Sequence, residues 1–542
     1  PINYACASNY SEMINEAIAR EKLNRVVLAA CSCCSSEQIC YSCTQPRIRC
    51  KENLFQKGLL DQRLFEFVNI REQCAWIHQA DKSQATAKAK DLIKMAVSRA
   101  RWLEAPPKEE IKIEKKAIVI GGGPAGIQCA IDLAEQGFPV TLVEKEPQLG
   151  GRLNQLNTPS FSHEGQGPAA TSGNRIEPKE LLNQLIDRLQ KLPVQIMTNT
   201  EVKGVEGGLG NFLISLKREN KTPKLTAGAI VLATGADFYR PNGEYGYGTA
   251  SNVITNNELT VKWPEISPDK IKKVTFIQCV GSNGHIDKRG CSKYCCETAL
   301  QQALGLKEKG VEPTILYQEL YLNNAKAQGL LRQAQAAEIT FIPYNGTKPP
   351  QINSSKGGNS LSIKLPGRKG RAISTDMIIL SVGMVAREDS KELAKLLRVP
   401  QGQDGFFKEK DPLLGLVETQ VPGIFLAGSC QGPKGTIDSM IHASAAASKA
   451  AILLAREKIY LDSLVNRLDE VKCRACGTCV TVCEFGAPRI ILSAQGKPVA
   501  RIDPVLCQSC GTCAAYCPSG AITAPCFTDK QINSMLESLL AS

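Results

Sequence analysis

Short apolar runs separated by stretches of helical periodicity define the middle of this chain. Three of them, Lys116–Ile120, Val140–Val143 and Ala229–Leu232, show no alternation between apolar and polar positions. Runs of this length are typical of parallel strands that are buried on both faces. A helical segment from Ile127 to about Gln136 follows the first run. The pattern therefore predicts an α/β fold with a Rossmann-like parallel sheet.

The turn after the first run matches the dinucleotide-binding fingerprint G-x-G-x-x-G at Gly121, Gly123 and Gly126. Its glycines allow a tight turn and a close approach of the backbone to a pyrophosphate at a helix N-terminus. The next run ends at Glu144, where a carboxylate can accept hydrogen bonds from the adenosine ribose hydroxyls. This order of elements favours a bound dinucleotide over a βαβ unit without a ligand.

Three downstream segments decide between FAD and NAD. The Gly150–Leu153, Ala229–Gly235 and Gly423–Ser429 segments resemble flavoproteins of the thioredoxin-reductase and glutathione-reductase class, although Ser429 replaces the usual Asp. A helix from about Thr436 to Ala455 should face the pyrimidine edge of the flavin. The resemblance implies FAD, with these binding residues: Gly121, Gly123, Pro124, Ala125, Gly126, Glu144, Lys145, Gly151, Arg152, Leu153, Val202, Thr234, Gly235, Gly428, Ser429 and Ile437.

Eight cysteines near the C-terminal end fall in two C-x-x-C-x-x-C-x-x-x-C runs, the second closed by a proline. This is the ligand pattern of a bacterial ferredoxin with two [4Fe–4S] clusters, in which each run gives three thiolates to one cube and one to the other. Zinc and disulfides are the alternatives. One predicted ligand set is Cys473, Cys476, Cys479 and Cys517, and the other is Cys507, Cys510, Cys513 and Cys483.

An insert within the flavin domain begins with a strand, Lys273–Gln278, but no second glycine fingerprint follows it. Four thiols stand there instead, ahead of a helix through Leu300 and Ala303. Four thiolates can hold one cube, so the insert is expected to contain a cluster in place of a nicotinamide. Buried structural cysteines are the alternative. The four thiols are Cys279, Cys291, Cys295 and Cys296.

Several segments together resemble the A subunit of heterodisulfide reductase over nearly the whole chain. They are Asn69–His78, Glu244–Gly248, Asn252–Asn256, Phe276–Ser282, the Cys291…Cys295-Cys296 run and Phe527–Ile532. The resemblance implies an FAD-containing electron-transfer subunit with about four [4Fe–4S] clusters. Its partners would be another redox subunit of the disulfide-reductase type together with a hydrogenase, a formate dehydrogenase or ferredoxin. The larger complex would contain a homodimer of this chain.

The same resemblance assigns an N-terminal cluster to Cys6, Cys31 and Cys74, with Cys34 or Cys50 as the fourth ligand. The family's Cys-Thr-Cys-Gly segment is absent here. Members thought to bifurcate electrons have a Lys ten residues after the first cysteine of the C-x-x-x-C-C run, where this chain has Gln301. The neutral amide favours plain electron transfer over flavin-based bifurcation.

Composition agrees with this interpretation. The 23 cysteines in 542 residues indicate metal clusters in a reducing, anaerobic cytoplasm rather than a secreted disulfide scaffold. The sequence contains no run of 18 apolar residues, so a transmembrane helix is not expected. The net charge of +12 lacks the aromatic interleaving of a nucleic-acid surface and can offset the negative charge of loaded clusters.

The expected fold is a split, two-domain FAD-linked reductase core of the α/β class, with an N-terminal cluster-binding domain and a C-terminal α+β ferredoxin domain. The chemistry leaves two alternatives, an NAD(P)H-dependent flavoprotein reductase fused to a ferredoxin and a cluster-based redox sensor. The expected limits are 1–104 for the N-terminal domain, 105–116 for a linker, 117–262 and 371–456 for the FAD domain, 263–370 for the insert, 465–526 for the ferredoxin and 527–542 for a closing helix.

Overall fold

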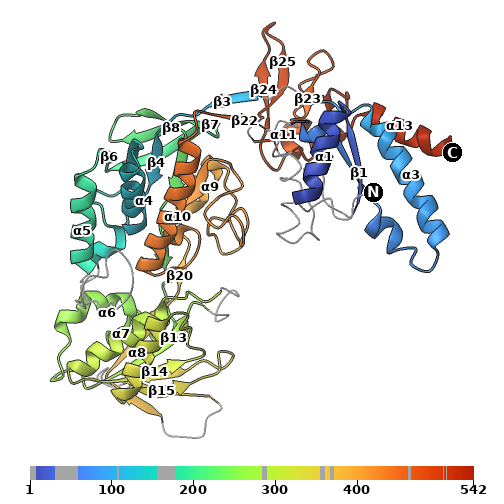
Figure 1. Cartoon of the computed structure of the whole chain (residues 1–542). Coiled ribbons are helices and arrows are strands. Elements are labelled where there is room, and N and C mark those ends of the chain that lie inside the picture. The colour runs from blue at the N-terminus through green and yellow to red at the C-terminus, as the bar shows by residue number, and fades with distance from the viewer. Residues whose placement is uncertain are drawn as a thin grey trace. The chain divides into compact units, whose positions relative to one another are not determined.

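The computed structural model describes residues 8–30, 59–105, 109–155, 178–282, 290–354, 361–366, 372–461, 465–504, 506–507, 509–525 and 527–541. The chain divides into two compact units (Figure 1). One unit combines both ends of the chain, Pro1–Ile111 and Tyr460–Ser542, and the other contains Lys112–Ile459.

The central unit contains a five-stranded parallel sheet, which forms its flavin-type lobe. In spatial order its strands are β21 (Ile424–Leu426), β10 (Ala229–Leu232), β4 (Ala117–Ile120), β5 (Val140–Val143) and β6 (Val194–Met197). The side chains of β4, β5, β10 and β21 are all buried, as their unbroken apolar runs predict. Residues almost 200 positions apart in the chain therefore pair in one sheet.

Helices and a second sheet surround this parallel sheet. Helix α4 (Pro124–Glu135) packs against α10 (Thr436–Leu454) and against α5 (Pro178–Gln190). A separate antiparallel sheet consists of β7 (Thr200–Gly208), β8 (Asn211–Arg218) and β9 (Lys224–Ala227). Helices α4 and α10 thus lie within a few residues of the bounds that the sequence predicted, 127–136 and 436–455.

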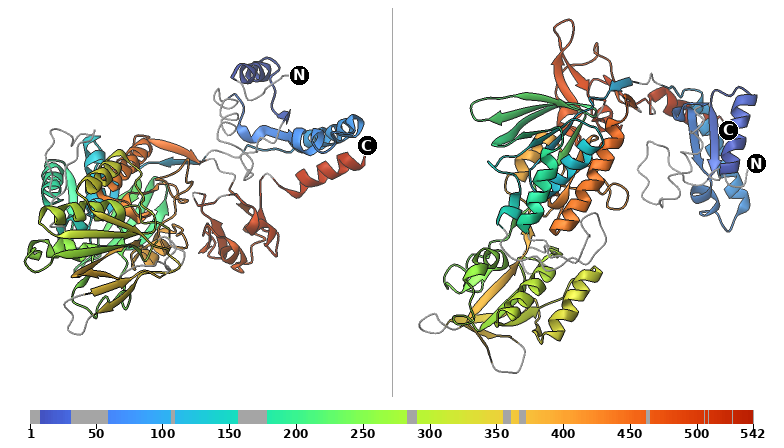
Figure 2. Two further views of the ribbon diagram at one scale, coloured as in Figure 1. Left: turned by 90° about the horizontal axis from the view of Figure 1, so that it is seen from below. Right: turned by 60° about the vertical axis from the view of Figure 1, so that its left-hand side comes forward.

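The insert forms a second lobe of the same unit (Figure 2, right). Its parallel sheet has the order β12 (Val253–Thr255), β19 (Met377–Val382), β13 (Lys273–Val280), β14 (Glu312–Tyr317) and β15 (Thr340–Pro343). Strands β12 and β19 lie outside the range 263–370 that the sequence suggested for the insert. They belong to its sheet because β19 pairs with both β12 and β13.

Both faces of the insert sheet are covered. One face packs against helices α6 (Asn256–Lys262), α7 (Cys295–Glu308) and α8 (Ala325–Ala336). The other face packs against the small antiparallel sheet β16 (Gln351–Ser354), β17 (Leu361–Lys364) and β18 (Ile373–Thr375).

A short antiparallel pair, β11 (Asp237–Phe238) with β20 (Met384–Val385), joins the two lobes, and α9 (Ser390–Leu397) follows it. The 3-10 segments of this unit are η3 (Gly151–Gln155), η4 (Trp263–Glu265) and η5 (Gly428–Cys430).

The terminal unit begins with α1 (Ser8–Arg20), β1 (Val26–Ala30), η1 (Gln62–Leu64) and β2 (Phe65–Asn69), and β1 pairs with β2 in parallel. A π-helical turn η2 (Arg71–Ala75) and the long helix α3 (Lys82–Ala100) follow. Strand β3 (Glu109–Lys112) then occupies part of the expected linker.

The C-terminal elements return to α3. After β22 (Lys458–Leu461), the ferredoxin-like part contains β23 (Arg467–Leu468), α11 (Thr478–Val482), β24 (Pro488–Leu492), β25 (Pro498–Ile502), α12 (Thr512–Ala515) and β26 (Ile522–Thr523). Helix α13 (Asp529–Leu540) packs along α3. The buried Gln531 amide donates to Trp102 O at 3.0 Å, and the Lys530 ammonium lies 3.5 Å from the centre of the Trp102 ring.

Among the described residues, no helix is long and apolar enough to cross a bilayer.

Candidate flavin and iron–sulfur sites

The three fingerprint glycines occupy different steric environments. A Cβ on Gly126 would lie 1.8 Å from Gly121 O, and a Cβ on Gly121 would lie 2.4 Å from Ala233 O. A Cβ on Gly123 would meet nothing within 4 Å. Gly121 and Gly126 therefore allow the helix to pack on the sheet, whereas Gly123 borders open space at the N-terminus of α4. This is the cradle that a pyrophosphate requires.

Two further groups fit a dinucleotide at this edge of the sheet. Glu144, at the end of β5, is buried, and its carboxylate accepts hydrogen bonds from the backbone N–H groups of Gly122 and Glu146. Thr234, after β10, has a buried hydroxyl without a hydrogen-bond partner in the described part of the chain. A buried hydroxyl is rarely left unpaired, so a ligand group that reaches Thr234 would satisfy it. The residues present fit FAD.

A histidine that no sequence motif contains holds the Gly423–Ser429 segment at the end of β21. The Gly428 N–H donates to His442 Nδ1 of α10 at 3.0 Å. Burial, together with the positive charge of Lys434, lowers the pKa of His442 to about 4, so the imidazole is neutral and free to accept. The Lys434 ammonium in turn donates to Gln431. His442 thus orients the backbone of the flavin motif, and only its spacing from Gly428 could have suggested this.

Arg152 of η3 lies where the two lobes of the central unit meet. Its guanidinium donates to Ala236 O and to Asp237 Oδ1, and it lies 4.1 Å from the centre of the Phe238 ring. The side chain is partly exposed. This position lets the residue contact both the connector and a ligand that reaches from the first lobe toward the second.

The remaining predicted FAD residues are spread around the same strand ends. Lys145 forms an ion pair with Asp389, whose pKa falls to about 2 because Arg387 and Lys145 donate to it. The others are Pro124 and Ala125 at the start of α4, Gly151 and Leu153 in η3, Val202 in β7, Gly235 after β10, Ser429 in η5, and the exposed Ile437 in the first turn of α10.

The insert brings its four predicted thiols together. Cys295 and Cys296 begin α7, are almost fully buried, and form a hydrogen-bonded pair. The hydrogen bond that Cys295 donates, together with burial and the charges of Cys296, Cys279 and Cys291, raises the pKa of Cys295 well above its ordinary value. The same hydrogen bond lowers the pKa of Cys296. Cys279 from the end of β13 and Cys291 before α7 therefore lie close enough to act on this pair.

The C-terminal end of β13 and the residues after it differ from a dinucleotide cradle. Cys279 adopts a left-handed φ of +64°, and Gly281 follows with a φ of +70°. A Cβ on Gly281 would lie 2.2 Å from the ring of Tyr239 in the connector between the lobes. The backbone at this strand end is thus packed against an aromatic ring, which leaves no open cradle for a pyrophosphate there.

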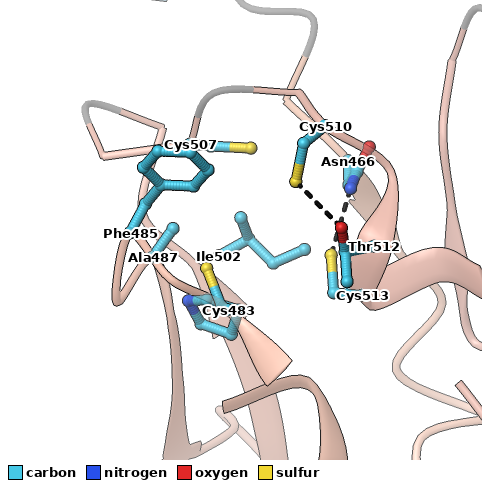
Figure 3. A pocket seen from close by; sticks show the side chains of 10 residues that line it. Asn466, Cys483, Phe485, Ala487, Ile502, Cys507, Cys510, Thr512 and Cys513 are labelled. Carbon is cyan, nitrogen blue, oxygen red and sulfur yellow. Dashed lines mark hydrogen bonds between the residues drawn. The ribbon is translucent and has the colours of Figure 1, made fainter. Parts of the chain in front are cut away.

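One of the two ferredoxin cluster sites is a pocket lined by a complete predicted ligand set. Cys483, Cys507, Cys510 and Cys513 surround it, together with Phe485, Ala487, Pro488, Ile502, Thr512 and Asn466. Figure 3 shows the four sulfurs pointing into a common space in front of Ile502. Cys483 comes from the end of α11, and the other three come from the second cysteine run. One pocket thus gathers Cys483 of the first run with three cysteines of the second, as the predicted exchange requires.

The first cysteine run has the same backbone as the second. Ala475 and Ser509 have φ values of +51° and +54°, and Gly477 and Gly511 both have +77°. A non-glycine residue rarely adopts such a φ, so its recurrence shows two copies of one turn. The remaining set is Cys473 and Cys479, which are buried, the exposed Cys476, and Cys517, whose charge acts on Cys476.

The N-terminal cluster site is only partly described. Cys74 is 1% exposed and lies in the π-helical turn η2 directly after β2. Cys6, Cys31, Cys34 and Cys50 lie outside the described residues. Within the described residues, no three His, Cys, Asp or Glu side chains are arranged to hold a single metal ion. In a [4Fe–4S] cube each thiolate binds a different iron, so its ligands are spaced more widely than those of a single ion.

Comparisons with known proteins agree with both kinds of site. A family model described as pyridine nucleotide-disulphide oxidoreductase matches residues 115–281, and one described as a 4Fe-4S dicluster domain matches residues 472–521. The second iron–sulfur A subunit of CoB–CoM heterodisulfide reductase from Methanopyrus kandleri is 31% identical, over 90% of this chain and 85% of its own length. The iron–sulfur A subunit of the same reductase from Methanocaldococcus jannaschii is 31% identical over 99% and 92%.

The chain belongs to the family of heterodisulfide reductase A subunits. The resemblance seen in the sequence is thereby confirmed, as are an oxidoreductase with a flavin domain of the pyridine nucleotide-disulphide oxidoreductase type, FAD and [4Fe–4S] clusters. Among solved structures, the thioredoxin reductase of Lactococcus lactis matches 63% of the chain at 20% identity and a TM-score of 0.45.

In this family member, the sequence motifs did not include two residues that support the predicted cofactor sites. His442 and Asn466 contact the flavin motif and a cluster cysteine, respectively, through single hydrogen bonds. Neither residue lies inside a motif. Asn466 precedes the first cysteine of its own run by seven positions, and its partner Cys513 lies in the other run. Such long-range contacts leave no local signal.

Proposed function

We propose that this chain is an FAD- and [4Fe–4S]-containing electron-transfer subunit of a complex resembling heterodisulfide reductase, without an organic substrate site of its own. The observation that carries the proposal is the cluster of four thiols at the end of β13. In a pyridine-nucleotide reductase this strand end would offer a glycine cradle to NAD(P). Here Cys279 leaves the strand in a left-handed conformation and lies near Cys291, Cys295 and Cys296.

The proposed relay has three protein parts. The insert thiols hold one cube, and the two ferredoxin sets, each with one cysteine exchanged, hold two more. The N-terminal cluster uses Cys74 with Cys6, Cys31 and either Cys34 or Cys50. FAD lies between β4, β10 and α10 on the residues described above. When bound, FAD exchanges electrons singly or in pairs, and each cluster exchanges them singly.

The chain's own groups bind and orient these cofactors. Gly123 leaves room for the pyrophosphate, Glu144 presents a buried carboxylate held by two backbone N–H groups, and His442 fixes the backbone of Gly428. Apolar residues around the second ferredoxin site, where Cys513 is buried and Cys510 is exposed, lower the local dielectric constant. In this proposal the protein contributes position and dielectric environment, and the cofactors contribute the redox chemistry.

The position of Gln301 supports electron transfer without bifurcation. Its amide donates to Glu297 Oε1 at 3.3 Å within α7. A neutral amide at this place brings no positive charge to stabilise a reduced, anionic flavin. The proposal is therefore that electrons pass singly along the relay and are not split between two acceptors.

Partners follow from the family. The relative from Methanothermobacter thermautotrophicus, 30% identical, is named as the A subunit of an H(2):CoB-CoM heterodisulfide,ferredoxin reductase, and one from Methanosarcina acetivorans is named as ferredoxin/F(420)H(2)-dependent. By analogy, a hydrogenase, a formate dehydrogenase or ferredoxin would supply electrons, and a disulfide-reducing subunit would accept them. We place the complex in the cytoplasm, with two copies of this chain as its core.

Anaerobic stopped-flow spectroscopy of the loaded chain tests the proposal. Reduced ferredoxin should bleach the flavin band near about 450 nm, whereas NADH and NADPH should leave it unchanged over the same period. Rapid bleaching by either nucleotide would refute the proposal and favour a flavoprotein reductase fused to a ferredoxin. A chain without any reducible flavin would instead favour a cluster-based sensor.

A further inference from the structure

Asn466 is a buried amide at the second ferredoxin site. It lies just before β23 and is 4% exposed. Its Nδ2 donates to Cys513 Sγ at 3.0 Å, as Figure 3 shows. Its Oδ1 is buried and has no hydrogen-bond partner among the described residues. Since burying an amide is costly unless it is hydrogen-bonded, the contact with the sulfur is the interaction that accounts for an Asn at this place.

The internal repeat of the ferredoxin domain shows that only the second of its two cluster sites has this contact. The two cysteine runs are offset by 34 positions, from Cys473 to Cys507 and likewise for the other three pairs. The same offset relates Asn466 to Ala500. Ala500 is 3% exposed and has no polar side chain. The first cluster site therefore lacks the side-chain donor that the second site has.

Other polar contacts of the sulfurs do not reproduce this asymmetry. Thr478 lies 3.3 Å from Cys476 Sγ and Thr512 lies 3.4 Å from Cys510 Sγ, a pair that the repeat matches. The first site has two longer contacts of its own, from Ala500 N to Cys473 Sγ at 3.4 Å and between Ser519 Oγ and Cys517 Sγ at 3.7 Å. Neither is a buried side-chain amide.

We propose that Asn466 tunes the reduction potential of the cluster held by Cys483, Cys507, Cys510 and Cys513, independently of its neighbour in the same domain. The inference rests on the ligand assignment proposed above, in which the Cys513 thiol of the structure stands for a cluster-bound thiolate. Reduction adds negative charge to a cluster, and a hydrogen bond to its sulfur stabilises the more negative state. Asn466 therefore makes this cluster easier to reduce than it would otherwise be, and shifts the distribution of an electron between the two clusters.

The test is an anaerobic redox titration of the loaded full-length chain, followed by electron paramagnetic resonance. Asn466→Leu keeps a similar volume but removes the donor. We expect the equilibrium constant for electron exchange between the two ferredoxin clusters to change about tenfold, which is about 59 mV for a one-electron couple. The potential of the cluster held by Cys483, Cys507, Cys510 and Cys513 should fall, and that of the other cluster should not change. A Cys510→Ala chain identifies the signal of the affected cluster, because it should lose that signal alone. Iron content should stay unchanged.

Two matched variants complete the design. Asn466→Asp keeps the shape and replaces the donor with an acceptor, so it should lower the same potential at least as far, and it supplies the measurement if the Leu variant loses iron. Ser519→Ala should leave this potential unchanged. Unchanged potentials in both Asn466 variants, or equal shifts of both clusters, would overturn the inference. Loss of both signals, or of neither, in Cys510→Ala would instead refute the ligand assignment.

Discussion

Two alanine substitutions in the glycine fingerprint should have separate effects, one on the stability of the fold and the other on the affinity for FAD. In the Gly126→Ala chain, the new Cβ would lie 1.8 Å from Gly121 O, more than 1 Å inside the closest contact that real Cβ atoms make. In the Gly123→Ala chain, the new Cβ would meet no protein atom within 4 Å. The first change should therefore strain the packing of α4 on the sheet, and the second should occupy only the space offered to the pyrophosphate.

The expected sizes follow from these contacts. Overpacking of a close contact costs about 1–3 kcal/mol of unfolding free energy, and relief of an overlap this deep should place Gly126→Ala at the upper end. For a unit of this size, each kcal/mol corresponds to about 2 °C in melting temperature, so a fall of about 4–6 °C is expected. Gly123→Ala should leave the apoprotein within about 1 °C of the parent. Its affinity for FAD should fall by at least tenfold, or about 1.4 kcal/mol.

Calorimetry of the apoproteins, with FAD titration followed by flavin fluorescence, measures both quantities in parallel samples. The unmodified chain and a Gly329→Ala chain, whose new Cβ in α8 of the insert would also meet no protein atom within 4 Å, serve as controls for FAD affinity. Binding of FAD by Gly123→Ala as tightly as by the parent would show that this space does not hold the pyrophosphate. Equal losses of stability in the two variants would show that the close contacts of Gly126 are not what packs α4 on the sheet.

Three further outcomes are expected. Cys483→Ser should disturb the cluster of the second cysteine run and Cys517→Ser that of the first, as seen in separate paramagnetic signals; loss of the same signal in both would contradict the exchange. Cys295→Ser should remove one further cluster and about four irons per chain, whereas Cys430→Ser, which alters a buried thiol that donates to Leu232 O, should remove none. The lowered pKa of His442 means that the unfolded chain binds more protons between about pH 4 and 6.5. Stability should therefore rise with pH across that window, and urea unfolding at pH 5 and 7 should show a smaller rise in His442→Gln.

Local sequence signals predicted much of the parallel core. The apolar runs at 117–120, 140–143 and 229–232 are strands with buried side chains, because a strand covered on both faces has no polar positions to interrupt it. The cysteine spacing located the ferredoxin turns because the ligands of one cube must come from one tight loop and a neighbouring helix. The ligand sets themselves remain predictions, although four of the thiols already line one pocket.

What the sequence could not show depends on contacts between distant segments. Strand β12 belongs to the insert sheet because it pairs with β19, more than 120 residues later. The hydrogen bonds from Gly428 to His442 and from Asn466 to Cys513 each join separate elements. A three-residue strand or a single buried amide lacks the periodicity on which pattern arguments rely. Strand β3 lies in the segment 105–116, for which the sequence predicted a linker.

The packing of α13 on α3 has a consequence for synthesis on the ribosome. Helix α3 ends at Ala100, and the helix that covers it begins at Asp529. At about 5–20 residues per second, more than 400 residues separate their emergence, a delay of roughly 20–90 s. Until α13 has been synthesised, the side of α3 that it covers stays exposed. The whole central unit, Lys112–Ile459, emerges and can fold during this interval. The terminal unit can therefore complete its fold only after the central unit has been synthesised.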